Sequence, residues 1–169
     1  GMMADPTWRE GFAQLAAFGL HFEATCYDEQ LDELLDLARS FPDQPIVLTH
    51  MGTPVGIGGG FAGVDHTGRE RRMIRRRWEA RMAALASSPN VTVKLSGLLM
   101  PCCGFGFEHR QTPAEPSDVA RALQPYIDSV VDSFGADRCM FASNFPVDKA
   151  SIDYETLFAA YRQVASVRT

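Results

Sequence analysis

The sequence lacks the features that would place it in a membrane or secreted class. Its longest apolar stretches are short and interrupted by glycine, proline or charge, so no segment has the roughly 18 to 20 apolar residues of a membrane helix. Residues 1–6 show no basic segment followed by an apolar core, the pattern of a secretory signal. The four cysteines form no Cys-x-x-Cys pair, so neither a disulfide framework nor a zinc ribbon is indicated. We expect a soluble, cytoplasmic protein with reduced cysteines and no membrane partner.

The chain has the composition of an ordinary globular domain, with 169 residues, 46% hydrophobic and 22% charged. Its net charge of −5 is spread unevenly, because residues 69–81 hold seven basic and two acidic residues and the rest holds nine and nineteen. The apolar positions Met73, Ile74 and Trp78 fit one face of a helix in this basic segment. We interpret the arginines as a solvated or interface-forming helix face, and expect no nucleic-acid partner.

Strand and helix patterns alternate along the chain. Short runs rich in β-branched and aromatic residues predict buried strands at 19–26, 45–50, 91–97 and 139–144. Apolar residues at three- and four-residue spacing predict helices at 28–40, 70–87, 117–134 and 153–165. Ser117 is the expected N-cap of the third helix, and Pro125 predicts a break or kink inside it. This alternation indicates an α/β fold, with parallel strands joined by crossover helices.

Two of the predicted strands carry a polar face. In the first strand Glu23 points away from the apolar positions, and in the third Thr92 and Lys94 alternate with Val91 and Val93. A doubly wound sheet is covered by apolar helices on both faces and reads as continuously apolar. The alternation here favours a barrel whose interior is polar near the carboxyl ends of the strands, where such folds place their ligand sites.

Polar residues follow two of the predicted strands at their carboxyl ends. His50 ends the second strand and Asn144 ends the fourth, and each precedes a tight connection containing glycine or proline. In a barrel these are the expected catalytic positions. The alternatives are a hydrogen-bonded histidine in a strand-to-loop turn, and an Asx-type turn before Pro146.

Other polar side chains on the strands suit an oxygen-rich or anionic small molecule. Lys94 either pairs with Glu23 as a structural ion pair or binds substrate. The candidate substrate-binding residues are His21, Glu23, Lys94 and Ser96.

Three segments carry a family resemblance: LTHMGTP at 48–54, NVTVKLSGL at 90–98 and FGADRCMFASNFPVDK at 134–149. They resemble the later strands of the amidohydrolase 2 family, in the branch of metal-dependent TIM-barrel hydrolases and lactonases. The resemblance implies that residues 1–169 are a single partial domain, the C-terminal half of an eight-stranded barrel, with strands five to eight. It also implies hydrolysis of a lactone or a related C–O or C–N bond.

The sequence departs from that family at two points. The family's first strand supplies a His-x-His metal pair, which no two histidines here can form. Where the superfamily has an aspartate that takes the proton from the attacking water, this chain has Asn144, and a carboxamide cannot act as a general base. The resemblance implies a divalent metal such as Zn²⁺ in a full-length parent, with His50 the only matched ligand here, so we expect none in this chain.

Two other interpretations compete with a hydrolase. One is a catalytically inactive barrel remnant or self-assembling protein, because four barrel strands leave two open edges. We expect the chain to pair with a second copy or with the missing N-terminal half. The other is a flavodoxin-like domain, but the Gly-x-Gly-x-x-Gly match at 58–63 lies too far from a strand end for dinucleotide binding, and favours an active-site loop.

Overall fold

A computed structural model describes residues 1–61, 63 and 66–167 of the chain. Its four strands form one parallel sheet in the order β1-β2-β3-β4. Their bounds are Phe22–Ala24 for β1, Ile46–Leu48 for β2, Val91–Leu95 for β3 and Cys139–Phe141 for β4. All four predicted strands are present, although shorter than expected, and the α/β class is confirmed.

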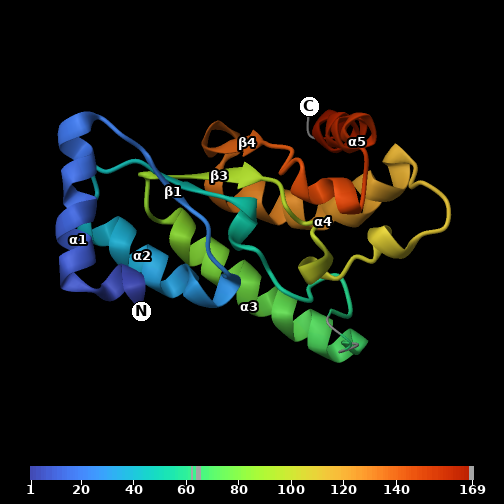
Figure 1. The fold of residues 1–169 in the computed structure, drawn as a ribbon, viewed down its shortest axis with the longest axis horizontal. Coiled ribbons are helices and arrows are strands. Elements are labelled where there is room, and N and C mark those ends of the chain that lie inside the picture. The colour runs from blue at the N-terminus through green and yellow to red at the C-terminus, as the bar shows by residue number, and fades with distance from the viewer. Residues whose placement is uncertain (62, 64–65, 168–169) are drawn as a thin grey trace.

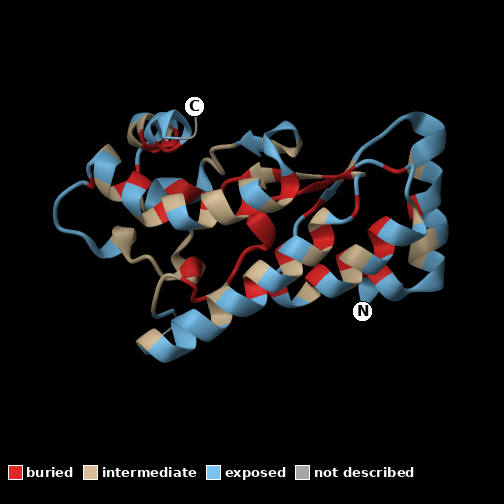
Figure 2. Cartoon of the chain, turned by 180° about the vertical axis from the view of Figure 1, so that it is seen from behind, coloured by how far each residue is buried: buried red, intermediate tan, exposed pale blue. Residues whose placement is uncertain are grey.

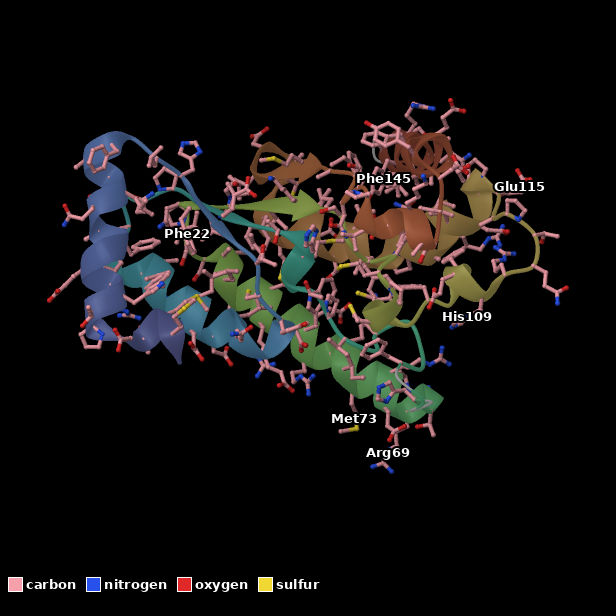
Figure 3. The ribbon with its side chains drawn as sticks, viewed as in Figure 1. Phe22, Arg69, Met73, His109, Glu115 and Phe145 are labelled. Atoms are coloured by element: carbon pink, nitrogen blue, oxygen red, sulfur yellow. The ribbon has the colours of Figure 1, made fainter. Side chains whose placement is uncertain are left out.

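The helices connect consecutive strands, as parallel neighbours require. Figure 1 shows α2 (Leu31–Ser40) and α3 (Gly68–Ala86) running along one side of the sheet, with α4 (Pro116–Phe134) leading to β4 and α5 (Tyr154–Ser166) following it. The helix α1 (Pro6–Ala13) was not expected from the sequence, since Phe12 is its only buried residue. Its aromatic side chains pack against Phe22 of β1 at one end of the core (Figure 3). The ring centroids of Trp8 and Phe12 lie 5.7 and 5.1 Å from the ring centroid of Phe22.

The expected N-cap of α4 and the expected break at Pro125 were wrong. Glu115 rather than Ser117 is its N-cap, because Pro116 takes the first helical position, where its missing N–H would have no partner anyway. The helix also continues through Pro125 without a break. Leu123 and Ile127 are buried on either side of that proline, so packing of the apolar face outweighs the lost backbone hydrogen bond.

The core lies between the sheet and these helices. Alternate strand residues point into it, and all are at most 3% exposed: Ala24, Ile46, Leu48, Val91, Val93 and Leu95. Facing them are buried helix residues that include Leu31, Leu34, Trp78, Leu85, Leu123 and Val130. Figure 2 shows these buried positions concentrated along the inner sides of the elements. In the basic segment Met73 is 61% exposed, so it does not belong to the apolar face on which the sequence placed it (Figure 3).

The opposite face of the sheet is polar in β1 and β3. Glu23 is exposed and Thr92 and Lys94 are half-buried, as the alternation in the sequence predicted, and the same face also carries the buried Val47 of β2 and the exposed Met140 of β4. A flavodoxin-like sheet has apolar helix cover on both faces, whereas here Glu23 is exposed and Lys94 is half-buried. The strands β1 and β4 form the two edges of the sheet. No helix among the described residues is long and apolar enough to cross a membrane.

Candidate active site at the strand ends

His50 lies in a strained turn directly after β2. His50 and Met51 both have left-handed backbones, with φ of 54° and 50°, a conformation that is uncommon for residues other than glycine. The core holds this turn in place, because the buried indole of Trp78 donates a hydrogen bond of 2.8 Å to the Met51 carbonyl. Such strain persists where the surrounding packing over-determines the backbone. The fold therefore fixes the place of the imidazole.

The His50 ring reaches across to the end of β3. Its Nδ1 lies 3.0 Å from Oγ of Ser96, whose side chain is 1% exposed. Gly97 follows with φ of +73°, and a Cβ built there would lie 2.6 Å from the His50 Cβ. A glycine is required at this position both for the backbone and for the approach of the ring. Ser96 and Gly97 thus hold the imidazole of His50 in place.

The electrostatic environment keeps this imidazole neutral. Burial lowers the pKa of His50 below its usual value of 6.5, the charge of Lys94 lowers it further, and Glu23 opposes these effects. Near neutral pH the ring has an unprotonated nitrogen and can accept a proton. His50 therefore has the protonation state that a general base needs.

Lys94 and Glu23 form an ion pair across the polar face of the sheet. The distance from Lys94 Nζ to Glu23 Oε1 is 2.6 Å, and the side chains are 26% and 56% exposed. The pair joins β1 to β3 over the intervening β2, and both charges act on the pKa of His50. His21 stands apart from this group. It is exposed and lies two residues before Glu23, about 7 Å toward the amino end of β1.

Asn144 occupies the carboxyl end of β4 with a left-handed backbone of φ 54°. Its amide Nδ2 donates a hydrogen bond of 2.8 Å to Oδ1 of Asp148, and the Asp148 N–H donates one of 3.1 Å to the Asn144 carbonyl. This bonding differs from the Asx turn considered as the alternative. Phe145 packs against the Tyr154 ring of α5 at 5.3 Å (Figure 3), and the Phe145–Pro146 bond is cis.

A model of the amidohydrolase family matches residues 3–166, almost the whole chain. The chain belongs to the amidohydrolase family. The resemblance seen in the sequence is thereby confirmed.

Relatives of the chain, and solved structures that are similar to it, agree with the assignment. The protein y4mH of Sinorhizobium fredii is 36% identical over 94% of the chain and 44% of its own length. An L-fucono-1,5-lactonase of Burkholderia ambifaria is 30% identical over 86% of the chain and 41% of its own length. The crystal structure of a Burkholderia multivorans amidohydrolase with bound Zn is 25% identical, with a TM-score of 0.79 over 98% of the chain and 52% of that structure. The chain thus spans about half the length of these proteins.

The residues of this amidohydrolase chain do not by themselves fit a metal ion. Zinc sites need about three protein ligands. The described part of the chain contains no group of three His, Cys, Asp or Glu side chains that could hold a metal. The imidazole of His50 lies beside Ser96 and feels the charges of Lys94, a cation, and of Glu23, whose carboxylate is paired with that lysine. A zinc site that used His50 would need further ligands from outside the described residues.

Sequence reasoning missed Asp148, a buried acid that contacts the candidate residue Asn144. It lies four residues after Asn144 in the turn Val147–Ala150, and its side chain is fully buried. Burial raises its pKa to about 6, against the opposing effect of the Asn144 hydrogen bond. The available signal was the spacing Asn-Phe-Pro-Val-Asp, in which an acid follows a proline turn at the end of a strand.

The cysteine pair lies near the same strand ends. The buried Cys103 thiol donates to the Gly97 carbonyl at 3.5 Å, and hydrogen bonding with Cys103 lowers the pKa of the Cys102 thiol to about 7. Cys102 also lines a cavity of about 830 Å³ together with residues from the end of β1, the loop after β2 and α3, which include Tyr27, Asp28, Phe61, His66 and Arg77. The segment 58–63, expected to be an active-site loop, lies in the connection after β2, which borders this cavity through Val55, Phe61 and His66. Positions 62, 64 and 65 lie outside the described residues.

Proposed function

We propose that this chain forms the later half, about strands five to eight, of a (β/α)₈ barrel that hydrolyses a lactone or a related C–O or C–N bond. The four parallel strands follow one another in chain order, as barrel strands do. The chain matches about half the length of each of two solved amidohydrolase structures, which supports the same arrangement. A complete barrel takes about 250 residues, so the rest of the barrel must come from another segment.

The observation that carries this proposal is the half-buried, neutral imidazole of His50 at the carboxyl end of β2, held by Ser96 beside the ammonium of Lys94. The carboxyl ends of the strands are where barrel enzymes place their catalytic groups. The described residues thus bring a proton acceptor and a positive charge to one place, which is what ester-type hydrolysis requires.

These groups suit the two halves of lactone hydrolysis. His50 takes a proton from water as the water oxygen bonds to the carbonyl carbon, and Asn144 orients that water. Lys94 stabilises the negative charge that develops on the carbonyl oxygen. When the tetrahedral intermediate collapses, the ring C–O bond breaks and His50 returns the proton to the leaving oxygen, so one water is consumed and a hydroxy acid is released.

The substrate class follows from the polar face and from the relatives. We infer an oxygen-rich or anionic small molecule, for which Glu23, Lys94 and Ser96 supply acceptors and donors, with His21 at the far end of the same face. Two relatives are L-fucono-1,5-lactonases, 30% and 28% identical to the chain. A sugar lactone is therefore the first substrate to test. A metal in the whole protein is compatible with this proposal, provided that other segments supply its ligands.

The test is turnover of L-fucono-1,5-lactone by the whole protein that carries this sequence, followed as acid release. We expect His50→Ala to lower kcat by at least about 100-fold, as expected when a general base is removed. The matched control is His109→Ala, because His109 is highly exposed on an outer turn. Equal loss in both variants, or full activity in His50→Ala, would reject the assignment of the base.

A second function is favoured by the open edges of the sheet. The strands β1 and β4 each have one unpaired side, and unpaired strands invite pairing with another chain. We infer that these edges pair with the missing half of the barrel or, in its absence, with a second copy. If the chain is an inactive barrel remnant, light scattering would detect such dimers, and the whole protein that carries this sequence would hydrolyse no lactone.

A further inference from the structure

Asp148 is an unusual residue for its position, because it is a fully buried acid with only one satisfied oxygen. Its side chain is 0% exposed, and Oδ1 accepts the hydrogen bond from Asn144. Its Oδ2 is buried and has no hydrogen-bond partner among the described residues. Nor does any ion pair of the described chain involve Asp148. A buried carboxyl with an unsatisfied oxygen is destabilising, and such groups cluster at functional sites.

The hydrogen bond decides which side of the Asn144 amide is available. A carboxamide has one donor side and one acceptor side, and an ionised carboxylate can only accept. The Asn144 nitrogen must therefore face Asp148, which turns the Asn144 oxygen away from the buried acid. We propose that Asp148 is a positioning residue, which holds Asn144 with its carbonyl oxygen presented to the attacking water at the carboxyl end of β4. This inference rests on the proposed function, and adds to it the group that sets the orientation of the water.

The surroundings of Asp148 make this arrangement depend on its charge. The titratable groups whose pKa values its charge raises are Cys102 and Cys103, in the turn Pro101–Cys103 of the loop after β3, and Tyr161 of α5. None of these is a cation that would hold the carboxylate ionised. When Asp148 is protonated it can donate to the Asn144 oxygen, so the amide can turn over and present its NH₂ group instead. The site then offers water a donor where it had offered an acceptor.

The experiment follows the Asn144 side-chain amide by ¹⁵N–¹H NMR between pH 4.5 and 8. We expect its two NH₂ signals to shift with a midpoint near 6, the value to which burial raises the pKa of Asp148, and to stop titrating in Asp148→Asn. The control is Asp137→Asn, since Asp137 is an exposed acid just before β4. An Asn144 amide that does not titrate in the unmodified protein overturns the inference, and that result does not depend on whether the variant folds.

A kinetic measurement in the whole protein separates this inference from the proposed function. We expect Asp148→Asn to lower kcat about 10-fold with KM within about 2-fold, and to remove from the kcat profile the step near pH 6 that Asp148 contributes, while the loss of activity on protonation of His50 remains. Turnover with an unchanged profile in Asp148→Asn overturns the positioning role while the hydrolase stands. Absence of lactone turnover in every variant overturns the proposed function, and with it the role in orienting water, whatever the amide signals show.

Discussion

The two faces of the sheet have the same strands and opposite properties. On the helix side every alternate residue from Ala24 to Leu95 is buried and apolar, whereas on the other side Glu23, Lys94 and Met140 are exposed or half-buried. In β3 the contrast is between adjacent residues, because Leu95 is 2% exposed and Lys94 next to it belongs to the ion pair with Glu23.

The difference shows how stability and chemistry are separated in this fold. The apolar face contributes to folding through burial, at about 25 cal/mol per Å² of apolar surface. The polar face contributes little to folding and holds the groups proposed to act on a substrate. Asp148 is the exception, since it is an ionisable group that we propose to act in the site and yet is fully buried.

The largest expected effect tests the contrast within β3. Leu95→Ala should lower the free energy of unfolding by about 2 to 5 kcal/mol, as for other buried leucines. Lys94→Ala, one position earlier, should lower it by no more than about 1 kcal/mol, because a partly exposed ion pair stabilises weakly. Urea unfolding followed by circular dichroism measures both. A cost for Lys94→Ala equal to that for Leu95→Ala would mean that the polar face is part of the core.

The next largest effect tests Asp148, the buried ionisable group. Because the pKa of Asp148 is raised from 3.8 to about 6, the native state holds its proton more tightly than the unfolded chain. Its contribution to stability is therefore fully present below about pH 4 and is lost as the pH rises through 6. Asp148→Asn should be more stable than the unmodified protein at pH 8, by on the order of 3 kcal/mol, and gain nothing near pH 4.

The same urea titrations, repeated from pH 4 to 8, measure this difference between the two proteins. Asp137→Asn, which changes an exposed acid, is the matched control. A gain in the free energy of unfolding that stayed constant with pH would mean that the pKa of Asp148 is not raised in the native state. Asp148 would then no longer be an exception to the separation of the two faces.

The smallest effect tests the junction between the two faces. Gly97→Ala should cost about 1 to 2 kcal/mol for the left-handed backbone alone, and more because its Cβ would meet His50 at 2.6 Å. The displaced imidazole should become more exposed, and its pKa should rise toward the usual value. Gly19→Ala is the control, since Gly19 has φ of +61° with nothing within 4 Å of its Cβ. Urea unfolding measures the stability of both variants, and NMR titration measures the pKa of His50. Equal losses of stability in Gly97→Ala and Gly19→Ala, with no change in the His50 pKa, would contradict the prediction.

Much of the fold could be predicted from the sequence, because it depends on local periodicity. The four helices and four strands lie within a few residues of their expected positions, and the polar alternation of β3 is as expected. The errors occurred where local rules meet tertiary packing: Pro125 does not break α4, and Met73 lies outside the apolar face of α3. The helix α1 was missed because a single buried aromatic, Phe12, makes no periodic pattern.

The candidate site was accessible only in part. His50 and Asn144 were identified from their place at strand ends, a rule of the fold class, and their catalytic roles stay predictions. Asp148 was not identified, because the spacing Asn-Phe-Pro-Val-Asp marks an acid after a proline turn but does not show whether that acid folds inward or toward solvent. Its burial follows from the packing of the turn against the β3 loop, where Ser151 donates to the Leu99 carbonyl at 2.6 Å.

The sequence by itself determined the order of elements, the apolar side of each, and the family to which the chain belongs. Only the tertiary structure decided which polar groups meet. Lys94 pairs with Glu23 from 71 positions away, and His50 meets Ser96 from 46 positions away. Such pairs depend on the register between strands, which the packing of the helices against the sheet sets and which no local period encodes. The charge state of His50 and Asp148 likewise depends on burial, which exists only once the chain is folded.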